Sequence, residues 1–123
     1  MGLFSFSGNK KELNWKILST LDQLNEIEKA SFTKTQVIFK HSTSCSISRM
    51  AKSRIESGLE ELEKDADVYY LDLLANRSIS NMIAEKWNVE HESPQILIIK
   101  NGKSIHDSSH NMISINDIQQ NLV

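Results

Sequence analysis

Short apolar runs that are typical of buried strands alternate along this chain with the residue spacing that is typical of helices. Residues 36–40, 67–73 and 95–100 are rich in β-branched and aromatic residues and predict three strands. The third run is apolar at consecutive positions, which indicates an interior strand covered on both faces. Asn101-Gly102 follows it directly and predicts a hairpin that returns antiparallel over residues 103–107.

Apolar residues three and four positions apart predict the helices between these strands. Residues 20–23 have the spacing of a capping box and begin a helix that extends to about Ala30. After Cys45, one apolar stripe predicts a single helix of about five turns that continues across Gly58. A third helix is predicted to begin near Asn76 or Ser78, and a short last helix at residue 114. The long stripe consists of Ile47, Met50, Ala51, Ile55, Leu59 and Leu62.

This order of elements predicts an α/β fold, because strands that alternate with helices need crossover connections. We expect a central mixed sheet of about four to five strands with helices on both faces, which among small folds is the thioredoxin-like arrangement. The length of 123 residues favours one domain, since two independent halves would each bury too little core. We therefore expect a loose leader at residues 1–12, a short extended piece at residues 15–18, and a single domain over residues 13–123.

Charge and cysteine content exclude several classes of function. With 14 basic and 16 acidic side chains the formal net charge is −2, which argues against a nucleic-acid partner. No stretch approaches the roughly 20 apolar residues of a membrane span, and residues 1–6 are too short for a secretory signal. The single cysteine excludes an intramolecular disulfide and a zinc site of several thiolates. We expect no membrane partner and a reducing cytoplasm as the compartment.

Cys45 is predicted at the junction between a strand and the first turn of the next helix. The N–H groups at a helix start lack intrahelical acceptors and carry partial positive charge, so a sulfur placed there is stabilised as the thiolate that attacks disulfides. Lys40 and His41 are expected to add positive potential, and Thr43 and Ser44 to leave the sulfur accessible. A buried structural cysteine is the alternative, and spacing alone leaves both open.

Serine stands where a dithiol enzyme has its second cysteine. The redox pattern Cys-x-x-Cys appears here as Cys45-Ser46-Ile47-Ser48. A hydroxyl can donate a hydrogen bond to a thiolate, but it cannot form a disulfide. Exchange should therefore stop at a mixed disulfide until a second thiol arrives.

Residues 39–48, Phe-Lys-His-Ser-Thr-Ser-Cys-Ser-Ile-Ser, resemble the signature of the YtxJ-like proteins, the monothiol bacilliredoxins. The similarity extends to Trp15, to the Tyr-Tyr-Leu-Asp segment at residues 69–72, and to Ser93-Pro94-Gln95. It implies a thioredoxin-like thiol-disulfide oxidoreductase that acts on mixed disulfides between proteins and bacillithiol, a low-molecular-weight thiol. The family commonly has proline directly after the cysteine, whereas this chain has Ser46, which keeps an N–H in the first helical turn.

The resemblance also implies roles for the site residues. Cys45 is the nucleophile, and Ser48 together with the amides at the helix start would hold its thiolate. In the thioredoxin fold a cis-proline lies opposite the cysteine, so Pro94 is expected to be cis and the Ser93 backbone to pair with an extended substrate. The remaining substrate-binding residues expected are Thr43, Ser44, His41 and Lys40.

The same resemblance implies the partners. Bacillithiol would serve as co-substrate, with no bound cofactor and no metal. The protein partners would be bacillithiolated proteins and, for regeneration, either bacillithiol or a dithiol redox protein. We expect a monomer. A dimer linked by a disulfide between the lone cysteines of two chains is the alternative.

Other functions stay open at this point. One is a thioredoxin-like binding module without catalysis that presents the Ser93-Pro94 groove to a partner. A glutathione-dependent monothiol glutaredoxin is less attractive, because residues 101–103 replace its usual Gly-Gly-Asp turn. His106 and His110 are four residues apart, but residues 107–109 predict a loop, so a metal site is not expected. His91 could flank this groove or be an ordinary exposed histidine. Arg49 could lie beside the thiolate or face solvent.

Overall fold

The computed structural model describes residues 15–122, so the expected leader at residues 1–12 lies outside the described part of the chain. The strands are β2 (Lys16–Ile17), β3 (Thr35–His41), β4 (Ala66–Asp72), β5 (Gln95–Lys100) and β6 (Lys103–Ser109). They form one sheet in the order β2-β4-β3-β5-β6. β2, β4 and β3 run parallel to one another, whereas β5 is antiparallel to both β3 and β6.

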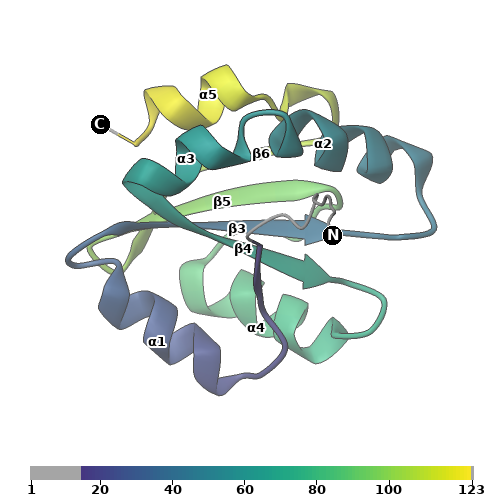
Figure 1. Ribbon diagram of the computed structural model, residues 1–123. Helices are drawn as coiled ribbons and strands as arrows, with labels where there is room; N and C mark the ends of the chain where they lie inside the picture. Colours follow the sequence, from purple (N-terminus) through teal and green to yellow (C-terminus); the bar gives the residue numbers. More distant parts are fainter. Residues whose placement is uncertain (1–14, 123) are drawn as a thin grey trace, which may run out of the picture.

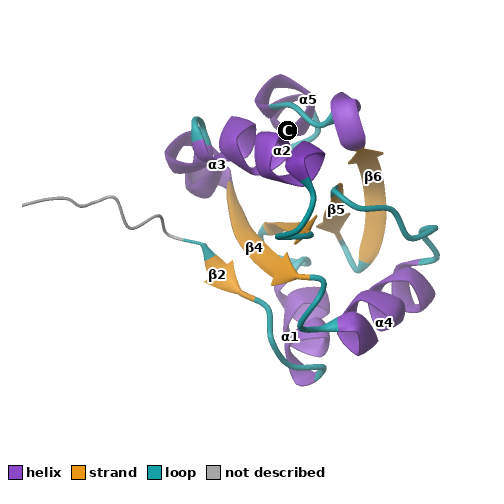
Figure 2. Ribbon diagram, turned by 90° about the vertical axis from the view of Figure 1, so that its right-hand side faces the viewer, coloured by secondary structure: helices purple, strands orange, loops and turns teal. Residues whose placement is uncertain are grey.

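Helices cover both faces of this sheet (Figures 1 and 2). They are α1 (Asp22–Ala30), α2 (Ser46–Glu56), α3 (Leu59–Asp65), α4 (Arg77–Trp87) and α5 (Ile115–Gln120), with a 3-10 turn, η2 (His110–Met112). α2, α3 and α5 lie on one face, and α1 and α4 lie on the other. The mixed sheet between two helical layers confirms the predicted α/β fold. None of the helices within residues 15–122 is both long and apolar enough to cross a bilayer.

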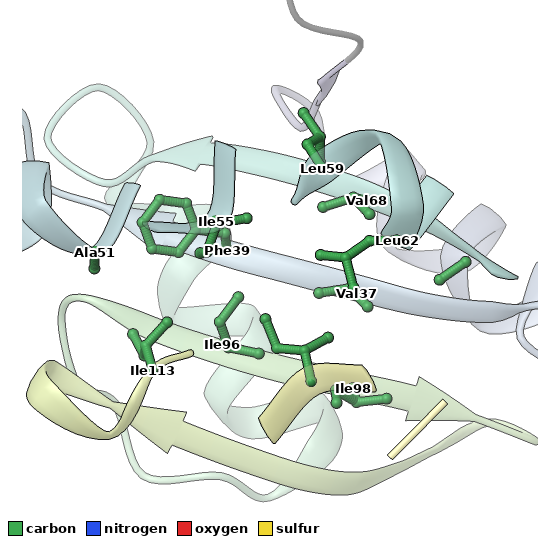
Figure 3. Packing of buried hydrophobic residues seen from close by; sticks show 12 residues of the cluster. Val37, Phe39, Ala51, Ile55, Leu59, Leu62, Val68, Ile96, Ile98 and Ile113 are labelled. Atoms are coloured by element: carbon green, nitrogen blue, oxygen red, sulfur yellow. The ribbon is translucent and has the colours of Figure 1, made fainter. Parts of the chain in front are cut away.

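The two helical layers bury two separate apolar cores, because successive side chains of a strand point to opposite faces. Val37, Phe39 and Ile96 point toward α2, α3 and α5, where they pack with Ile55 and Leu62 (Figure 3). On the other face, the members of the core are Leu18, Leu24, Ile27, Ile38, Leu71, Ile79, Ile83, Trp87, Leu97 and Ile99. Lys40 and His41 follow the same alternation, so they leave β3 on opposite faces.

The prediction of one long helix after Cys45 is wrong in one respect. The helix breaks at residues 57–58 and forms two helices, α2 and α3. A Cβ atom on Gly58 would lie 2.8 Å from Cδ1 of Ile115, so the approach of α5 requires glycine there. The first part of the predicted stripe is also not in the core. Ile47 is 45% exposed and Met50 is 62% exposed.

The predicted hairpin between β5 and β6 is present. Asn101 and Gly102 have φ values of 54° and 80°, the left-handed backbone that a tight two-residue turn needs. β6 continues to Ser109, so the loop predicted at residues 107–109 is instead strand. His106 Nε2 lies 2.8 Å from Asp117 Oδ2, and no group of three or more metal-ligating side chains occurs among residues 15–122.

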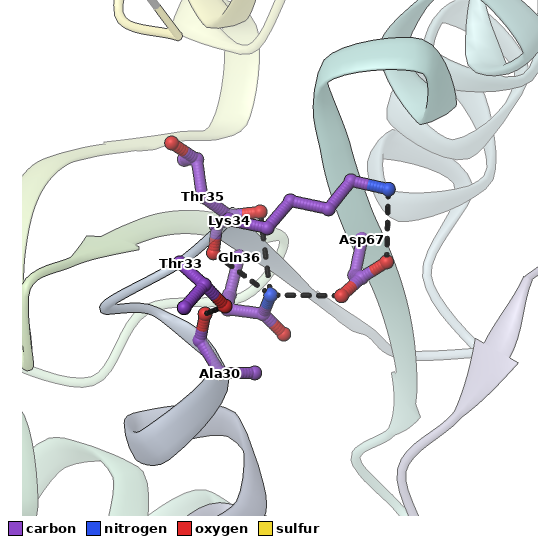
Figure 4. A network of polar contacts seen from close by, with 6 residues as sticks. All are labelled: Ala30, Thr33, Lys34, Thr35, Gln36 and Asp67. Carbon is purple, nitrogen blue, oxygen red and sulfur yellow. Dashed lines mark hydrogen bonds and ion pairs between the residues drawn. The ribbon is translucent and has the colours of Figure 1, made fainter.

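A polar cluster ties β3 to β4 at the end of the sheet away from Cys45 (Figure 4). Asp67 accepts a hydrogen bond from Gln36 Nε2 at 2.8 Å through Oδ2, and its Oδ1 lies 3.3 Å from Lys34 Nζ. Gln36 and Asp67 are paired in the parallel register of β3 and β4. The cluster therefore fixes the register that brings the opposite ends of these strands to the site.

Candidate functional site

Segments that carry the predicted site residues meet at one edge of the sheet. β5 runs antiparallel to β3 and pairs Gln95 with Lys40, so Pro94 lies beside the end of β3, where the loop to Cys45 begins. The Ser93-Pro94 peptide bond is cis, as the family resemblance implied. The topology thus brings Ser93-Pro94 and the loop of residues 42–44 to the same edge.

Cys45 is the N-cap residue of α2 and is partly exposed. Its backbone is extended, with φ −109° and ψ 125°, and its carbonyl accepts the first helical hydrogen bond from Arg49 N–H at 3.1 Å. Its own N–H donates to the carbonyl of Ser42 at 3.2 Å, which closes a turn. The Cys45 side chain makes no capping hydrogen bond to the helix, so its sulfur is held at the helix start by the backbone alone.

Ser48 occupies a different place from the one expected of a thiolate donor. Its side chain is fully buried, and its hydroxyl oxygen accepts a hydrogen bond from Ser42 N–H at 2.9 Å. The same oxygen lies 3.1 Å from Nδ1 of His41. Ser48 therefore fastens the loop before Cys45 to α2 and to the end of β3.

His41 lies under this loop and stacks against aromatic neighbours. Its ring centroid is 5.5 Å from that of Tyr70 and 5.7 Å from that of Phe39. Burial lowers the pKa of His41, and the positive charge of Lys52 lowers it further. The imidazole is therefore largely neutral near pH 7, and the expected positive potential from His41 is not supported.

Lys40 leaves β3 on the face of α4, opposite the helix that carries Cys45. It is fully buried, and its Nζ lies 3.3 Å from Nδ1 of His91, which is also 3.2 Å from the hydroxyl of Ser80. Burial lowers the pKa of Lys40 to about 8. This placement does not support a surface role in substrate binding. It makes Lys40 a tether for the segment before Pro94, because His91 lies in that segment.

The remaining expected substrate-binding residues lie around the cysteine loop. Thr43 and Ser44 are exposed, and the hydroxyls of Ser44 and Ser42 are 3.2 Å apart. The hydroxyl oxygen of Ser93 is buried and has no hydrogen-bond partner within residues 15–122. Thr43 and Ser44 thus give the loop before Cys45 small, exposed polar side chains.

The sequence did not predict a group of interacting side chains beside this loop, formed by Lys52, Tyr70, Glu56 and Trp15. Lys52 and Tyr70 lie next to the site, with Lys52 Nζ 5.6 Å from the centre of the Tyr70 ring. Lys52 Nζ also lies 2.7 Å from Glu56 Oε2, which accepts a second hydrogen bond from Trp15 Nε1 at 3.1 Å. No motif joins these residues, and the one sequence signal was the Tyr-Tyr-Leu-Asp segment at the end of its strand.

The chain is similar to known proteins both in sequence and in overall fold. A family model described as monothiol bacilliredoxin BrxC matches residues 16–118. A solved structure described as having a thioredoxin fold and, provisionally, an oxidoreductase activity is 33% identical, covers 85% of this chain and 90% of its own, and has a TM-score of 0.76. The thioredoxin of Malassezia sympodialis is 17% identical over 90% of both chains, with a TM-score of 0.70. The thioredoxin of Fasciola hepatica is 18% identical over 87% of this chain and 95% of its own, with a TM-score of 0.67. The two thioredoxins show a shared fold.

Proposed function

The chain belongs to the monothiol bacilliredoxin family, and on that premise we propose that it removes bacillithiol from protein mixed disulfides through Cys45. The observation that carries the proposal is the position of this sulfur. The only cysteine of the sequence lies partly exposed at the N-cap of α2, on the sheet edge that also carries Ser93-Pro94. A thiol at that place can meet an incoming disulfide and gains from the positive end of the helix.

In the proposed cycle, the Cys45 thiolate attacks the bacillithiol sulfur of a bacillithiolated protein. A disulfide forms between Cys45 and bacillithiol, the original disulfide breaks, and the protein leaves as a thiolate that takes up a proton. A second bacillithiol thiolate then attacks the bacillithiol sulfur on Cys45. This step releases the Cys45 thiolate and oxidised bacillithiol, and a dithiol redox protein could replace the second bacillithiol.

The fourth position of the redox pattern supports a monothiol route. Ser48 cannot form a disulfide, and its hydroxyl is engaged with Ser42 and His41. The mixed disulfide on Cys45 therefore has to be resolved by a thiol from another molecule. We propose Ser93 as the residue whose backbone pairs with the protein substrate, because Ser93 precedes Pro94 on the shared edge.

The test is the turnover of a bacillithiolated model protein by the full chain. Cys45→Ser should abolish release of bacillithiol while the circular dichroism spectrum and thermal melt stay those of the wild type. Ser46→Ala, at the exposed neighbouring position, is the matched control and should retain activity. Activity that survives Cys45→Ser would end the proposal.

A catalytically inactive binding module is the second candidate, and one observation favours it. The Cys45 side chain makes no capping hydrogen bond to the amides at the start of α2, the contact expected to hold a thiolate there. The two functions differ in how fast iodoacetamide alkylates Cys45 at neutral pH. Alkylation faster in the native protein than in the urea-unfolded chain favours exchange chemistry, and slower alkylation favours the binding module.

We propose the reducing cytoplasm as the setting, with the chain working as a monomer. Mass spectrometry of protein purified without reductant would identify the native thiol, since Cys45 is the only sulfur that can carry a disulfide adduct. A bacillithiol adduct is the expected result. A disulfide-linked dimer alone would instead favour an air-oxidised or structural thiol.

A further inference from the structure

A cleft of about 390 Å³ opens beside the loop that carries Cys45, on the side of β4. β3 lies between β4 and β5 in the sheet, so this cleft and the Ser93-Pro94 segment flank the cysteine loop from opposite sides. The residues that line the cleft and matter here are Arg49, Lys52 and Glu56 from α2, with His41, Thr43 and Tyr70 from the sheet and loop.

Arg49 brings a positive charge to this cleft that is not paired by an acidic side chain of residues 15–122. Its guanidinium is exposed, makes one long hydrogen bond of 3.4 Å to the carbonyl of Thr43, and forms no ion pair with residues 15–122. The other cation, Lys52, lies 2.7 Å from the Glu56 carboxylate. The cleft therefore presents one positive charge that is free to meet an anion.

Other polar groups in the cleft are also available. The hydroxyls of Tyr70 and Thr43, two of the residues that line the cleft, have no hydrogen-bond partner in the described part of the chain. A small ligand with a carboxylate would find a guanidinium and two hydroxyls there.

The cleft begins next to the sulfur-bearing residue. Arg49 N–H donates to the carbonyl of Cys45 at 3.1 Å, so Arg49 lies one helical turn after Cys45. Thr43 precedes Cys45 by two positions in the loop. A small thiol that forms a disulfide with Cys45 could therefore reach the cleft with the rest of its molecule.

We propose that this cleft binds the small-thiol half of the mixed disulfide and selects thiols that carry a carboxylate, with Arg49 as the anchor. The inference rests on the exchange reaction proposed above and adds a binding site to it. The protein half of the disulfide then extends on the other side of the loop, toward Ser93-Pro94. No bond other than those of the exchange reaction forms or breaks.

The test is a set of mixed disulfides between one cysteine peptide and three small thiols of different charge. Mercaptopropionate is anionic, mercaptoethanol is neutral and cysteamine is cationic. The rate at which reduced protein releases the peptide thiol is measured for each, and each rate is divided by that of free cysteine under the same conditions. Arg49→Gln should lower the ratio of the anionic to the neutral rate about three- to tenfold, the range of an exposed charge-assisted contact.

Two further variants separate charge recognition from other effects. Arg49→Lys keeps the positive charge and should retain most of the wild-type ratio. Lys64→Gln removes a charge from the exposed face of α3 outside the cleft and should leave the ratio unchanged. A fall of all three rates by the same factor in Arg49→Gln would mean that Arg49 acts on the Cys45 thiolate, and it would overturn the proposal, as would an unchanged ratio.

The same peptide linked to bacillithiol separates this inference from the proposed function. If the wild type does not release that peptide, the proposed function fails. If the wild type releases it and Arg49→Gln does so equally fast, the exchange reaction stands and the cleft site is wrong. A selective loss with Arg49→Gln, matched by the loss for mercaptopropionate, supports both.

Discussion

The hydroxyl oxygen of Ser48 lies 2.9 Å from the backbone nitrogen of Ser42 and accepts its hydrogen. Ser48→Ala would leave this N–H without its partner and would also remove the contact to Nδ1 of His41. We expect a loss of about 1–2 kcal/mol in the free energy of unfolding, because this part-buried donor loses its hydrogen bond. Urea denaturation followed by circular dichroism measures it.

Ser46→Ala is the matched control for this substitution, because Ser46 is exposed in the same helical turn. It should change the free energy of unfolding by less than about 0.5 kcal/mol. Equal urea midpoints for the two variants would show that the Ser48 hydroxyl does not fasten the loop.

Gly58 is a second position at which a small substitution should change the free energy of unfolding. Gly58 is the N-cap residue of α3, a position at which glycine is preferred over alanine, so local preference does not favour Gly58→Ala. The added Cβ would also lie 2.8 Å from Cδ1 and 2.9 Å from Cγ1 of Ile115. We expect overpacking to be the main cost and Gly58→Ala to destabilise the protein by about 1–3 kcal/mol.

A double-mutant cycle with Ile115→Ala tests the cause. When the Ile115 side chain is absent, the cost of Gly58→Ala should fall below about 1 kcal/mol, the size of the N-cap preference of glycine over alanine. A destabilisation of the same size on both backgrounds would place the cause in the backbone of the α2–α3 junction.

Much of the fold follows from local patterns, and the exceptions depend on distant contacts. The strands could be predicted because runs such as residues 36–40 and 95–100 are rich in apolar and β-branched residues, which is typical of buried strands. The break between α2 and α3 could not, since the residue packed against Gly58 is Ile115, which lies far away in the sequence. The apolar stripe continues through this break, so periodicity alone predicts a single helix.

The site also contains features that local patterns predict and features that depend on distant contacts. Cys45 could be placed at a helix start because a strand, a polar loop and a helix follow one another in the sequence. The surroundings of Lys40 and Ser48 could not be predicted, since they depend on which face of β3 a side chain leaves and which loop folds over it. The cleft around Arg49 combines α2 with Tyr70 of β4, and no spacing in the sequence links the two.

Lys40 gives a prediction about pH. The pKa of its amine is about 8 in the folded protein, lowered by burial from the ordinary value of 10.5. Between these two values the unfolded chain binds more protons than the folded one, so the contribution of Lys40 to stability rises from pH 8 to pH 10.5. The full change over this window is about 3 kcal/mol.

Lys40→Met removes the buried amine and keeps most of the side-chain length. At pH 7 we expect this variant to be more stable than the wild type by about 1–4 kcal/mol, because no carboxylate in the described part of the chain pairs with Lys40. The difference should shrink as the pH rises from 8 toward 10, whereas Lys64→Met, at an exposed site, should follow the wild type at every pH. Urea denaturation at pH 7, 8, 9 and 10 measures these differences. Since tyrosines titrate alike in all three proteins, a constant gap between wild type and Lys40→Met would show that the amine of Lys40 stays protonated in the fold throughout this range.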